Sequence, residues 1–328
     1  MHNSFGSLLR ITTFGESHGL ALGVVIDGCP AGIPLSEKDF LPELARRRPG
    51  QSAITTPRKE DDTPTILSGV FEGKTTGMPI AVVVANTNQK PEAYEKLRTE
   101  FRIGHADAVF ADKFGHRDHR GGGRQSGRET VSRVIAGVIA RKILPKTTKI
   151  IGHTLQIGPI HAQTFKPDAI EKNPVRCADP VVAKKMEALI LQRKSEADSV
   201  GGVIEIRIQK PPKNLGDPVF DKLKAQLAKA IMSIGAVTGF SYGAGFATAD
   251  MRGTEYVKNK ENFGGILGGI STGDDMILHL SIKPASSIGQ VAKEGRHDPC
   301  IVPRVIPVAE AMVAIVLADC LLMQRVYE

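Results

Sequence analysis

Apolar positions along this chain recur with two different spacings, and each spacing predicts a different kind of element. Recurrence every three or four residues, which gathers apolar side chains on one helical face, predicts helices at 37–48, 129–144 and 220–234. Short apolar or alternating runs predict strands at 20–26, 78–85, 203–208 and 276–282. Because helices and strands interleave, an α/β or α+β arrangement is expected.

The clearest helix is 129–144. Its apolar residues fall at positions i, i+3, i+4, i+7 and i+8, namely Val131, Val134, Ile135, Val138 and Ile139. A further segment, 307–323, is apolar almost all round, which predicts a helix buried on every side. Glu310 and Asp319 are its few polar interruptions.

Several helix ends carry recognisable signals. Ser36 precedes Asp39 at the spacing of a capping box, and Ser126 precedes Glu129 in the same way ahead of the clearest helix. The helix at 37–48 is expected to end at Pro49–Gly50 and to bury a stripe of Phe40, Leu41 and Leu44. The helix at 220–234 is expected to end at Gly235.

Composition describes an ordinary folded chain. Its 328 residues suffice for a large core, and no repeat or pooled Gly/Pro linker divides them, so residues 1–328 are expected to form one catalytic domain. Four cysteines without CxxC spacing argue against a zinc knuckle or a disulfide framework. Because there is no signal peptide and no apolar run reaches about 18 residues, we expect a soluble, cytoplasmic protein without membrane contact.

Positive charge points to anionic ligands. Lysine and arginine exceed aspartate and glutamate by 8, which favours anions of any kind, from nucleic acid to phosphorylated metabolites. Residues 115–129 place four arginines around the triple glycine 121–123, just ahead of the clearest helix. Glycines let backbone N–H groups turn inward, and the helix N-terminus adds a positive end. We therefore expect this segment to bind phosphate or the polar edge of a flavin rather than to form a plain solvent-facing turn.

Three consecutive arginines end the helix at 37–48. Arg46, Arg47 and Arg48 complement the helix dipole there. Because three consecutive residues span most of the helix circumference, at least one is expected to face the body of the protein and clamp a carboxylate or phosphate.

Other polar residues lie in loops or at a strand end. His18, His105 and His297 stand in polar, Gly-flanked contexts, which makes them candidates for proton transfer near neutral pH. Residues 283–287, KPASS, follow the strand at 276–282, a usual place for ligand contacts.

Four other kinds of site fit parts of the sequence less well. Residues 69–75 lack one residue of a P-loop, and 121–126 do not follow a convincing strand as a dinucleotide-binding loop would. His116 and His119, with Asp118 between them, suit a metal-dependent phosphohydrolase, but no further ligands appear at metal-site spacing, so no metal is expected. An RNA-binding protein could use 120–124, but with no Trp and four Tyr the chain is poor in base-stacking groups, so no nucleic-acid partner is expected.

Five motifs, in order, resemble the signatures of the chorismate synthase family. They are TFGESHG at 13–19, RRRPG at 46–50, GHAD at 104–107, RGGGR at 120–124 and GRHDP at 295–299. The resemblance runs from near the start of the chain to near its end.

This resemblance implies a lyase that converts 5-enolpyruvylshikimate 3-phosphate to chorismate and phosphate by 1,4-anti elimination. Reduced FMN is implied as a cofactor without net redox change. The resemblance also implies a homotetramer and an α+β sandwich, β-α-β in layers, with a helical core between antiparallel sheets. Whether NADPH or an external reductant supplies the reduced flavin is left open by the sequence.

The resemblance also assigns catalytic roles. His18 would be the general acid at the departing phosphate, and His105 would protonate or hydrogen-bond the reduced flavin. Asp298 would relay the proton from the flavin N5, and Ser17 and Ser126 would join the same hydrogen-bond network.

Binding roles follow from the same comparison. Arg47 would grip the substrate, with Arg46, Arg48 and Arg124 as helpers. Flavin contacts are implied for Arg124, Gln125, Ser126, Gly235, Ala236, Gly268, Lys283, Pro284, Ala285, Ser286, Ser287 and Arg296.

Three departures from the family pattern bear on ligand binding. Ala53 stands where many members have an arginine, so that cation is either missing or supplied by Arg58. Gly235 stands where asparagine is common, and the stretch between 287 and 295 is shorter than usual, which would leave the flavin less covered. The catalytic positions are intact, so activity is expected.

Overall fold

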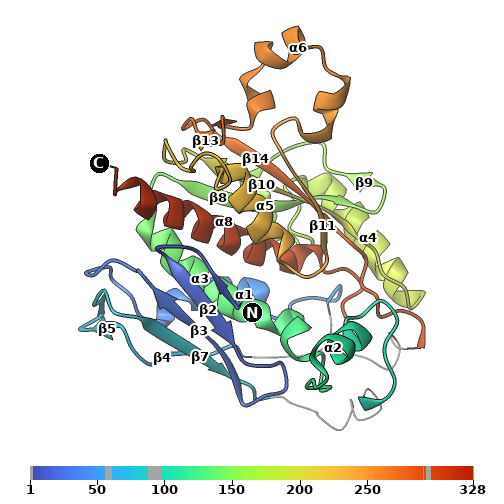
Figure 1. The fold of residues 1–328 in the computed structure, drawn as a ribbon. Helices are drawn as coiled ribbons and strands as arrows, with labels where there is room; N and C mark the ends of the chain where they lie inside the picture. Colours follow the sequence, from blue (N-terminus) through green and yellow to red (C-terminus); the bar gives the residue numbers. More distant parts are fainter. Residues whose placement is uncertain (1–2, 56–60, 88–97, 291, 293–296, 328) are drawn as a thin grey trace.

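Two five-stranded antiparallel sheets enclose a layer of helices (Figure 1). The structure is a computed structural model that describes residues 3–55, 61–87, 98–290, 292 and 297–327. Every strand pairing within these residues is antiparallel. The expected α+β class, with helices between antiparallel sheets, is therefore confirmed.

The two sheets come from different parts of the chain. The first sheet, in the order β1-β2-β3-β7-β4, consists of β1 (Ser4–Phe5), β2 (Arg10–Phe14), β3 (Ala21–Asp27), β7 (Ile80–Ala85) and β4 (Pro64–Ile66). The second sheet, in the order β11-β14-β10-β8-β9, consists of β11 (Val237–Tyr242), β14 (Met276–Ile282), β10 (Gly202–Gln209), β8 (Lys149–Ile157) and β9 (Ile160–His161).

Two small hairpins stand apart from these sheets. One pairs β12 (Ile266–Leu267) with β13 (Ile270–Ser271). The other pairs β5 (Val70–Phe71) with β6 (Lys74–Thr75), and its turn residues Glu72 and Gly73 have φ values of 48° and 73°. Residues 69–75, which lack one residue of a P-loop, thus contain a β-hairpin.

Helices fill the space between the sheets and cover their ends. The α-helices are α1 (Leu41–Arg47), α2 (Asp107–Phe114), α3 (Thr130–Ile143), α4 (Pro180–Ser195), α5 (Leu223–Met232), α6 (Gly253–Lys258) and α8 (Val302–Gln324). Short 3-10 turns are η1 (Glu37–Asp39), η3 (Gly123–Gln125), η4 (Gly127–Glu129), η5 (Pro167–Lys172), η6 (Gly245–Asp250) and η7 (Lys260–Phe263).

Helices α3 and α8 form the centre of the core. Helix α3 packs on β3 of the first sheet, α8 packs on β8 of the second, and the two helices contact each other. A Cβ added to Gly137 of α3 would lie 2.3 Å from the Cβ of Ala311 in α8, so the absence of a side chain permits this close approach. The site described below lies at the end of this helical layer, where α3 begins.

Helix α8 is long and apolar enough to cross a membrane by length and composition, but 89% of its apolar window is buried inside the fold. Its predicted polar interruptions are both buried and bonded. Asp319 accepts hydrogen bonds at 2.8 Å from the backbone N–H groups of Ser7, Leu8 and Leu9, and thereby fixes the turn between β1 and β2. Helix α8 is therefore a core helix that also holds neighbouring segments through polar contacts.

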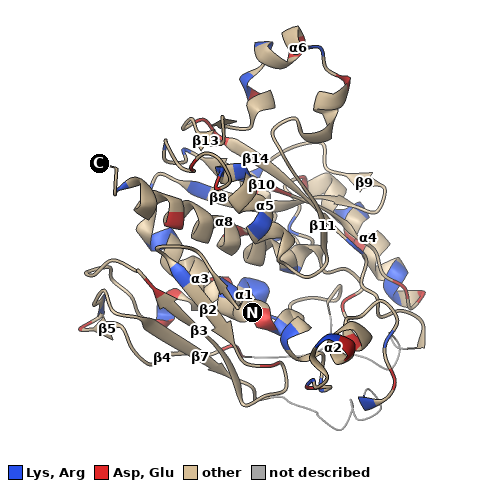
Figure 2. Ribbon diagram, in the orientation of Figure 1, with Lys and Arg blue, Asp and Glu red and all other residues tan. Residues whose placement is uncertain are grey.

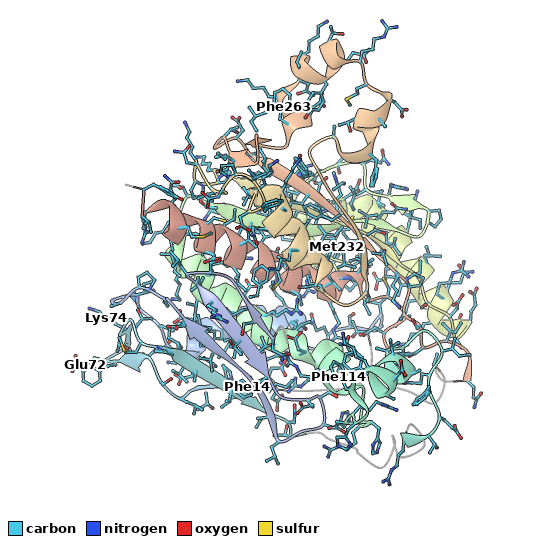
Figure 3. All side chains as sticks on the ribbon, viewed as in Figure 1. Phe14, Glu72, Lys74, Phe114, Met232 and Phe263 are labelled. Carbon is cyan, nitrogen blue, oxygen red and sulfur yellow. The ribbon has the colours of Figure 1, made fainter. Side chains whose placement is uncertain are left out.

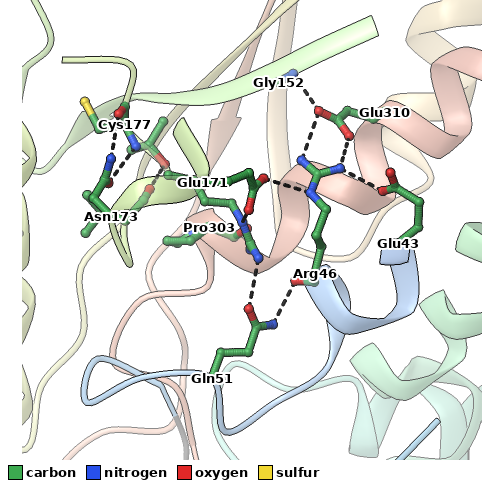
Figure 4. Close-up of polar contacts among 12 residues, drawn as sticks. Glu43, Arg46, Gln51, Gly152, Glu171, Asn173, Cys177, Pro303 and Glu310 are labelled. Carbon is green, nitrogen blue, oxygen red and sulfur yellow. Dashed lines mark hydrogen bonds and ion pairs between the residues drawn. The ribbon is translucent and has the colours of Figure 1, made fainter. Parts of the chain in front are cut away.

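The second buried carboxylate of α8, Glu310, belongs to a charged cluster shown in Figure 4. It accepts from Arg46 of α1 at 2.6 Å, from Arg141 of α3 at 3.0 Å and from the Gly152 backbone N–H of β8 at 2.6 Å. One buried anion thus joins four elements, and removing it would take a buried partner from Arg141 and leave Arg46 to its more exposed partners Glu43 and Glu171.

Some apolar residues at the edges of predicted elements are exposed instead of buried. Strand β3 begins after Leu20, β7 begins after Met78, and α5 begins after Phe220. The helix predicted at 37–48 is divided into η1 and α1, and this break turns Leu41 to solvent while Phe40 and Leu44 stay buried. Its capping signal is confirmed, since the Ser36 N–H donates to Asp39 Oδ2 at 2.7 Å.

Two other helix-end predictions are wrong in detail. Ser126 Oγ accepts from the Arg128 N–H at 3.3 Å, but the Glu129 carboxylate does not return to Ser126 and binds Thr13 Oγ1 at 2.9 Å. Gly235 does not take the left-handed conformation that ends a helix, because α5 ends at Met232 and the following Ala236 has the positive φ of 73°.

An excursion of residues 245–263, made of η6, α6 and η7, projects from the second sheet (Figure 3). Phe263, labelled in that view, packs edge-on against Tyr256 at 5.2 Å between ring centroids. This excursion lies away from α2 and the start of α3.

Candidate active site

A cavity of about 1150 Å³ lies among β1 and β2, the start of α3, helix α2 and the segment after β14. Pockets of roughly 300–1,000 Å³ hold a drug-sized ligand, so this one has room for more than one small molecule. Its walls come from segments far apart in the chain, including 3–16, 102–130, 229–236, 283–287 and 297–312.

The cavity carries a cationic excess. Its described lining includes nine basic residues: Arg47, Arg102, Arg117, Arg124, Arg128, Arg133, Lys229, Lys283 and Arg304. It includes five acidic residues: Glu16, Asp107, Asp118, Glu129 and Asp298. Figure 2 shows basic residues on α1 and both signs of charge around α2 and the start of α3. Because basic side chains outnumber acidic ones, the cavity favours anionic ligands.

Ser17 and His18 lie directly behind the glycine-rich loop. Both are buried, and Ser17 Oγ lies 3.0 Å from His18 Nδ1. Gly121, which lines the cavity, has φ +64°, and a Cβ there would lie 2.2 Å from His18 Nδ1 and 2.9 Å from Ser17 Oγ. Neither Ser17 nor His18 itself lines the cavity, but the imidazole packs directly against Gly121, which does.

His105 also lines the cavity, just ahead of α2. Its Nε2 is 3.1 Å from Ser287 Oγ, which joins two segments that the sequence separates widely. Burial lowers the pKa of His105, the positive charge of Arg102 lowers it further, and Asp107 opposes these effects. The neutral imidazole is therefore favoured at neutral pH.

The strand-end segment 283–287 forms another wall, together with Gly235 and Ala236. The Lys283 N–H donates to the Ala236 carbonyl at 2.9 Å. Ser286 Oγ accepts from Lys283 Nζ at 3.0 Å and donates to the Gly104 carbonyl at 3.1 Å. The structure thus brings together the predicted ligand contacts at 235–236 and at 283–287, next to the loop that carries His105.

The three consecutive arginines have three different environments. Arg47 is buried, lines the cavity and forms an ion pair with Asp62 at 2.6 Å. Arg46 points away into the cluster of Figure 4, where burial by itself would lower its pKa but the carboxylates, Glu310 first, raise it. Arg48 is exposed and does not line the cavity. The expectation that at least one of the three faces the body of the protein is confirmed.

Arg124 lines the cavity, but its guanidinium also holds the end of β2. It donates to Thr13 Oγ1 at 2.6 Å, to the Thr13 carbonyl at 3.2 Å and to the Gly15 carbonyl at 3.2 Å. Gln125 and Ser126 line the cavity beside it. The loop 121–126 is therefore anchored to the first sheet through this arginine.

Asp298 lines the cavity just ahead of α8. Its carboxylate forms an ion pair with Arg304, whose Nε also donates to the Arg47 carbonyl at 3.1 Å. The neighbouring His297 also lines the cavity, and burial followed by the charge of Arg102 lowers its pKa. Asp298 is thus linked to the end of α1, where Arg47 enters the site.

Other predicted contacts lie elsewhere. Gly268 is in the turn between β12 and β13 and does not line the cavity. Ala53 is exposed, and its carbonyl accepts from Lys194 Nζ at 2.7 Å. Arg58, Gly295 and Arg296 lie outside the described residues, as does part of the shortened stretch 287–295.

Sequence reasoning did not find several charged groups of the site. Asp62 pairs with both Arg47 and Arg128, and Arg102 pairs with Asp107 at 2.8 Å. Arg128 lies in the arginine-rich segment, which was a usable signal. For Asp62 the partners lie 15 and 66 residues away, so no local pattern marks it.

The candidate metal ligands have another arrangement. Both oxygens of Asp118 accept from Arg120, at 2.8 Å each, which competes with a metal ion for that carboxylate. Within the described ranges, no group of three His, Cys, Asp or Glu residues has the geometry to hold a metal ion.

Comparisons with known proteins agree with one another. A family model described as chorismate synthase matches residues 9–322. A curated chorismate synthase of Methanosarcina mazei is 48% identical, covering 97% of this chain and 95% of its own, and one of Rippkaea orientalis is 48% identical, covering 99% and 98%. A solved structure titled as the crystal structure of chorismate synthase is similar with a TM-score of 0.79 and 30% identity, covering 98% of this chain and 93% of its own.

Proposed function

The chain belongs to the chorismate synthase family of lyases, and we propose that it eliminates phosphate from 5-enolpyruvylshikimate 3-phosphate to give chorismate. The carrying observation is that Arg47, His105 and Asp298 line one cationic cavity, while His18 lies against Gly121 of its wall. These residues come from four of the five sequence motifs, and the fifth supplies the loop 121–124. A multiply anionic substrate fits the excess of basic side chains.

Reduced FMN is the proposed cofactor, and the lining residues suit it. The loop 121–123 has positive φ at all three glycines, which brings backbone rather than side chains to the cavity. Gln125, Ser126, Gly235, Ala236 and residues 283–287 offer polar groups along the same cavity, and Lys283 and Arg124 add positive charge for a phosphate. When bound, reduced flavin supplies electron density that assists cleavage of the allylic C–O bond and a site for the hydrogen lost from C6.

His18 is the proposed general acid at the departing phosphate. Since Nδ1 faces Ser17 Oγ at 3.0 Å, the proton for the phosphate would be carried at Nε2. Gly121 lets the ring approach the cavity wall because a side chain there would collide with it. Ser17 thus orients the ring, and Gly121 provides the space.

His105 and Asp298 are proposed to handle the remaining proton. The lowered pKa of His105 favours a neutral imidazole, which acts by hydrogen bonding at Nε2 or Nδ1 rather than by carrying charge. Asp298 would take up a proton on its carboxylate, and its pair with Arg304 keeps that carboxylate in the wall. Ser287, at 3.1 Å from His105 Nε2, helps to fix the imidazole orientation.

For the substrate, Arg47 is the proposed principal contact. Arg124 and Arg128 also line the cavity, whereas Arg46 and Arg48 do not. We therefore propose that Arg46 supports the site by holding α1 through Glu310, so that the adjacent Arg47 is presented to the cavity.

We further propose that the chain is one catalytic domain that works as a cytoplasmic homotetramer, without nucleic-acid or membrane partners. The family match over residues 9–322 and the continuous core support a single domain. Gly268 lies away from this cavity, so a role for it in cofactor binding would have to come through assembly. Light scattering should give four times the chain mass of 35.2 kDa.

The test is an anaerobic assay of the purified protein with 5-enolpyruvylshikimate 3-phosphate and chemically reduced FMN. Chorismate absorbance and free phosphate should rise in equal amounts, without net oxidation of the flavin. A parallel reaction with oxidised FMN and NADPH tests whether the protein reduces its own flavin. Phosphate release without chorismate, or release that needs a divalent metal and no flavin, would contradict the proposal.

A further inference from the structure

We propose that Asp62 is a positioning residue that aligns Arg47 and Arg128 on one anionic group of the substrate. This inference rests on the function proposed above. Asp62 is buried and does not line the cavity, whereas both arginines do. The carboxylate therefore acts from behind the cationic wall and not by contact with the ligand.

The geometry places one carboxylate oxygen on each arginine. Asp62 Oδ2 accepts from Arg47 Nη2 at 2.6 Å, and Oδ1 forms the ion pair with Arg128 Nη1. Arg47 arrives from the end of α1 and Arg128 from η4, ahead of α3. Because a carboxylate is rigid and its two oxygens are used separately, it sets the spacing between the two guanidinium groups.

Electrostatics explains why a carboxylate is needed there. Arg47 is buried, which disfavours its charge, and the nearby positive charges of Arg304 and Arg128 lower its pKa further, against the attraction of Asp62. Burial of Asp62 opposes its ionisation, but the two arginines outweigh this effect and lower its pKa. The aspartate therefore stays ionised and offsets repulsion between two cations that face the same cavity.

The same chain of contacts reaches the turn that carries the proposed acid. Arg128 Nε donates to Asn86 Oδ1 at 3.1 Å, and Asn86 Nδ2 donates to the carbonyls of Glu16 at 3.0 Å and Gly19 at 2.8 Å. Those two residues bracket Ser17 and His18. Asp62 thus aligns the substrate-side arginines in a fixed relation to the turn that holds His18.

A positioning role and a simple charge effect predict opposite results when the charge of Asp62 is removed. If only net charge mattered, Asp62→Asn would make the cavity more positive and lower KM for the anionic substrate. If Asp62 positions the arginines, the same change removes the anion that the two guanidinium groups share, so they repel each other and KM rises. A role confined to folding would lower thermal stability without a change in KM.

The experiment compares four variants in the anaerobic assay at saturating reduced FMN, with a melting curve for each. Asp62→Asn removes the charge, and Asp62→Glu retains it. Asp61→Asn is the exposed control one residue earlier, and Asp319→Asn is a buried control whose carboxylate accepts from the backbone N–H groups of Ser7, Leu8 and Leu9 and does not line the cavity. Wild-type chorismate formation is measured first, because its absence would refute the proposed function independently of Asp62.

We expect Asp62→Asn to raise KM at least about tenfold, with kcat changed less than about threefold, because the arginines bind the ground state and transition state alike. Asp62→Glu should recover part of this loss, Asp61→Asn should match wild type, and Asp319→Asn should melt lower with an unchanged KM. An unchanged or lower KM for Asp62→Asn in an active, folded protein overturns the proposal. If Asp62→Asn does not fold, Asn86→Ala tests the next contact, and a KM equal to wild type there also overturns it.

Discussion

Gly121→Ala is the substitution that most sharply probes the placement of the proposed acid. A methyl group at this position would lie 2.2 Å from His18 Nδ1 and 2.9 Å from Ser17 Oγ, both closer than packed atoms tolerate. The loop or the imidazole must therefore move. Gly121 also has φ +64°, so alanine carries a backbone penalty of about 1–2 kcal/mol in addition to the collision.

Gly115→Ala separates these two effects. Gly115 has φ +69°, nearly the same backbone conformation, and no atom lies within 4 Å of the position its Cβ would take. Both variants should therefore lose about 1–2 kcal/mol of unfolding free energy through the backbone. Gly121→Ala should lose about 1–3 kcal/mol more, the usual cost of overpacking.

Activity should separate the two variants further. A shift of roughly 1 Å in a reacting group can cost on the order of a hundredfold in rate. At 1.36 kcal/mol per decade, this corresponds to about 2.7 kcal/mol in the barrier. We expect kcat to fall by about that factor in Gly121→Ala and to stay near wild type in Gly115→Ala. Anaerobic stopped-flow measurement of chorismate formation gives kcat, and equal kcat values for the two variants would refute the account of His18.

Three further predictions follow from the site and the core. His105→Ala and Asp298→Ala should each slow turnover at least about tenfold with an unchanged far-UV circular dichroism spectrum, and near-normal rates would remove their proposed roles. Folding lowers the pKa of His105, so its contribution to the free energy of unfolding is complete above the unfolded pKa of about 6.5 and is lost as pH falls through the lower folded pKa. The drop in Tm between about pH 7.5 and 5 should therefore be smaller in His105→Gln than in wild type. An equal drop in the two proteins would count against this assignment. Glu310→Gln should lower the unfolding free energy by about 3–5 kcal/mol, because Arg46 and Arg141 lose their shared anion. Denaturant unfolding measures this change, and Glu43→Gln, at a more exposed partner of Arg46, is the control. An equal effect of the two variants would contradict the role of Glu310.

Local patterns in the sequence were sufficient to predict the elements whose burial is simple. Strand β14 spans 276–282 as predicted, and α3 differs from its predicted limits by one residue at each end. The amphipathic pattern is weaker in α4, where only Ala183, Met186 and Ile190 are buried, and this helix was not predicted. Its position depends on packing at one edge of the second sheet, which a periodicity argument does not contain.

The site shows a similar division. Motif resemblance located several residues that line the cavity and singled out Arg47 for the substrate, but it also made Arg46 and Arg48 substrate contacts, and neither of these two lines the cavity. Arg46 turns towards Glu310, more than 260 positions later in the chain, while Arg47 turns towards Asp62. These tertiary partners go with the position of each arginine relative to the cavity, and neither partner lies in the motif.

The most direct test of the central claim is a crystal structure of the protein with FMN and 5-enolpyruvylshikimate 3-phosphate bound. The account predicts both molecules in the 1150 Å³ cavity, with the substrate against Arg47 and the flavin along residues 283–287. It also predicts that the substrate phosphate lies next to the His18 imidazole, which packs against Gly121. Density for either molecule at a different surface, or a substrate bound without contact to Arg47, would contradict it.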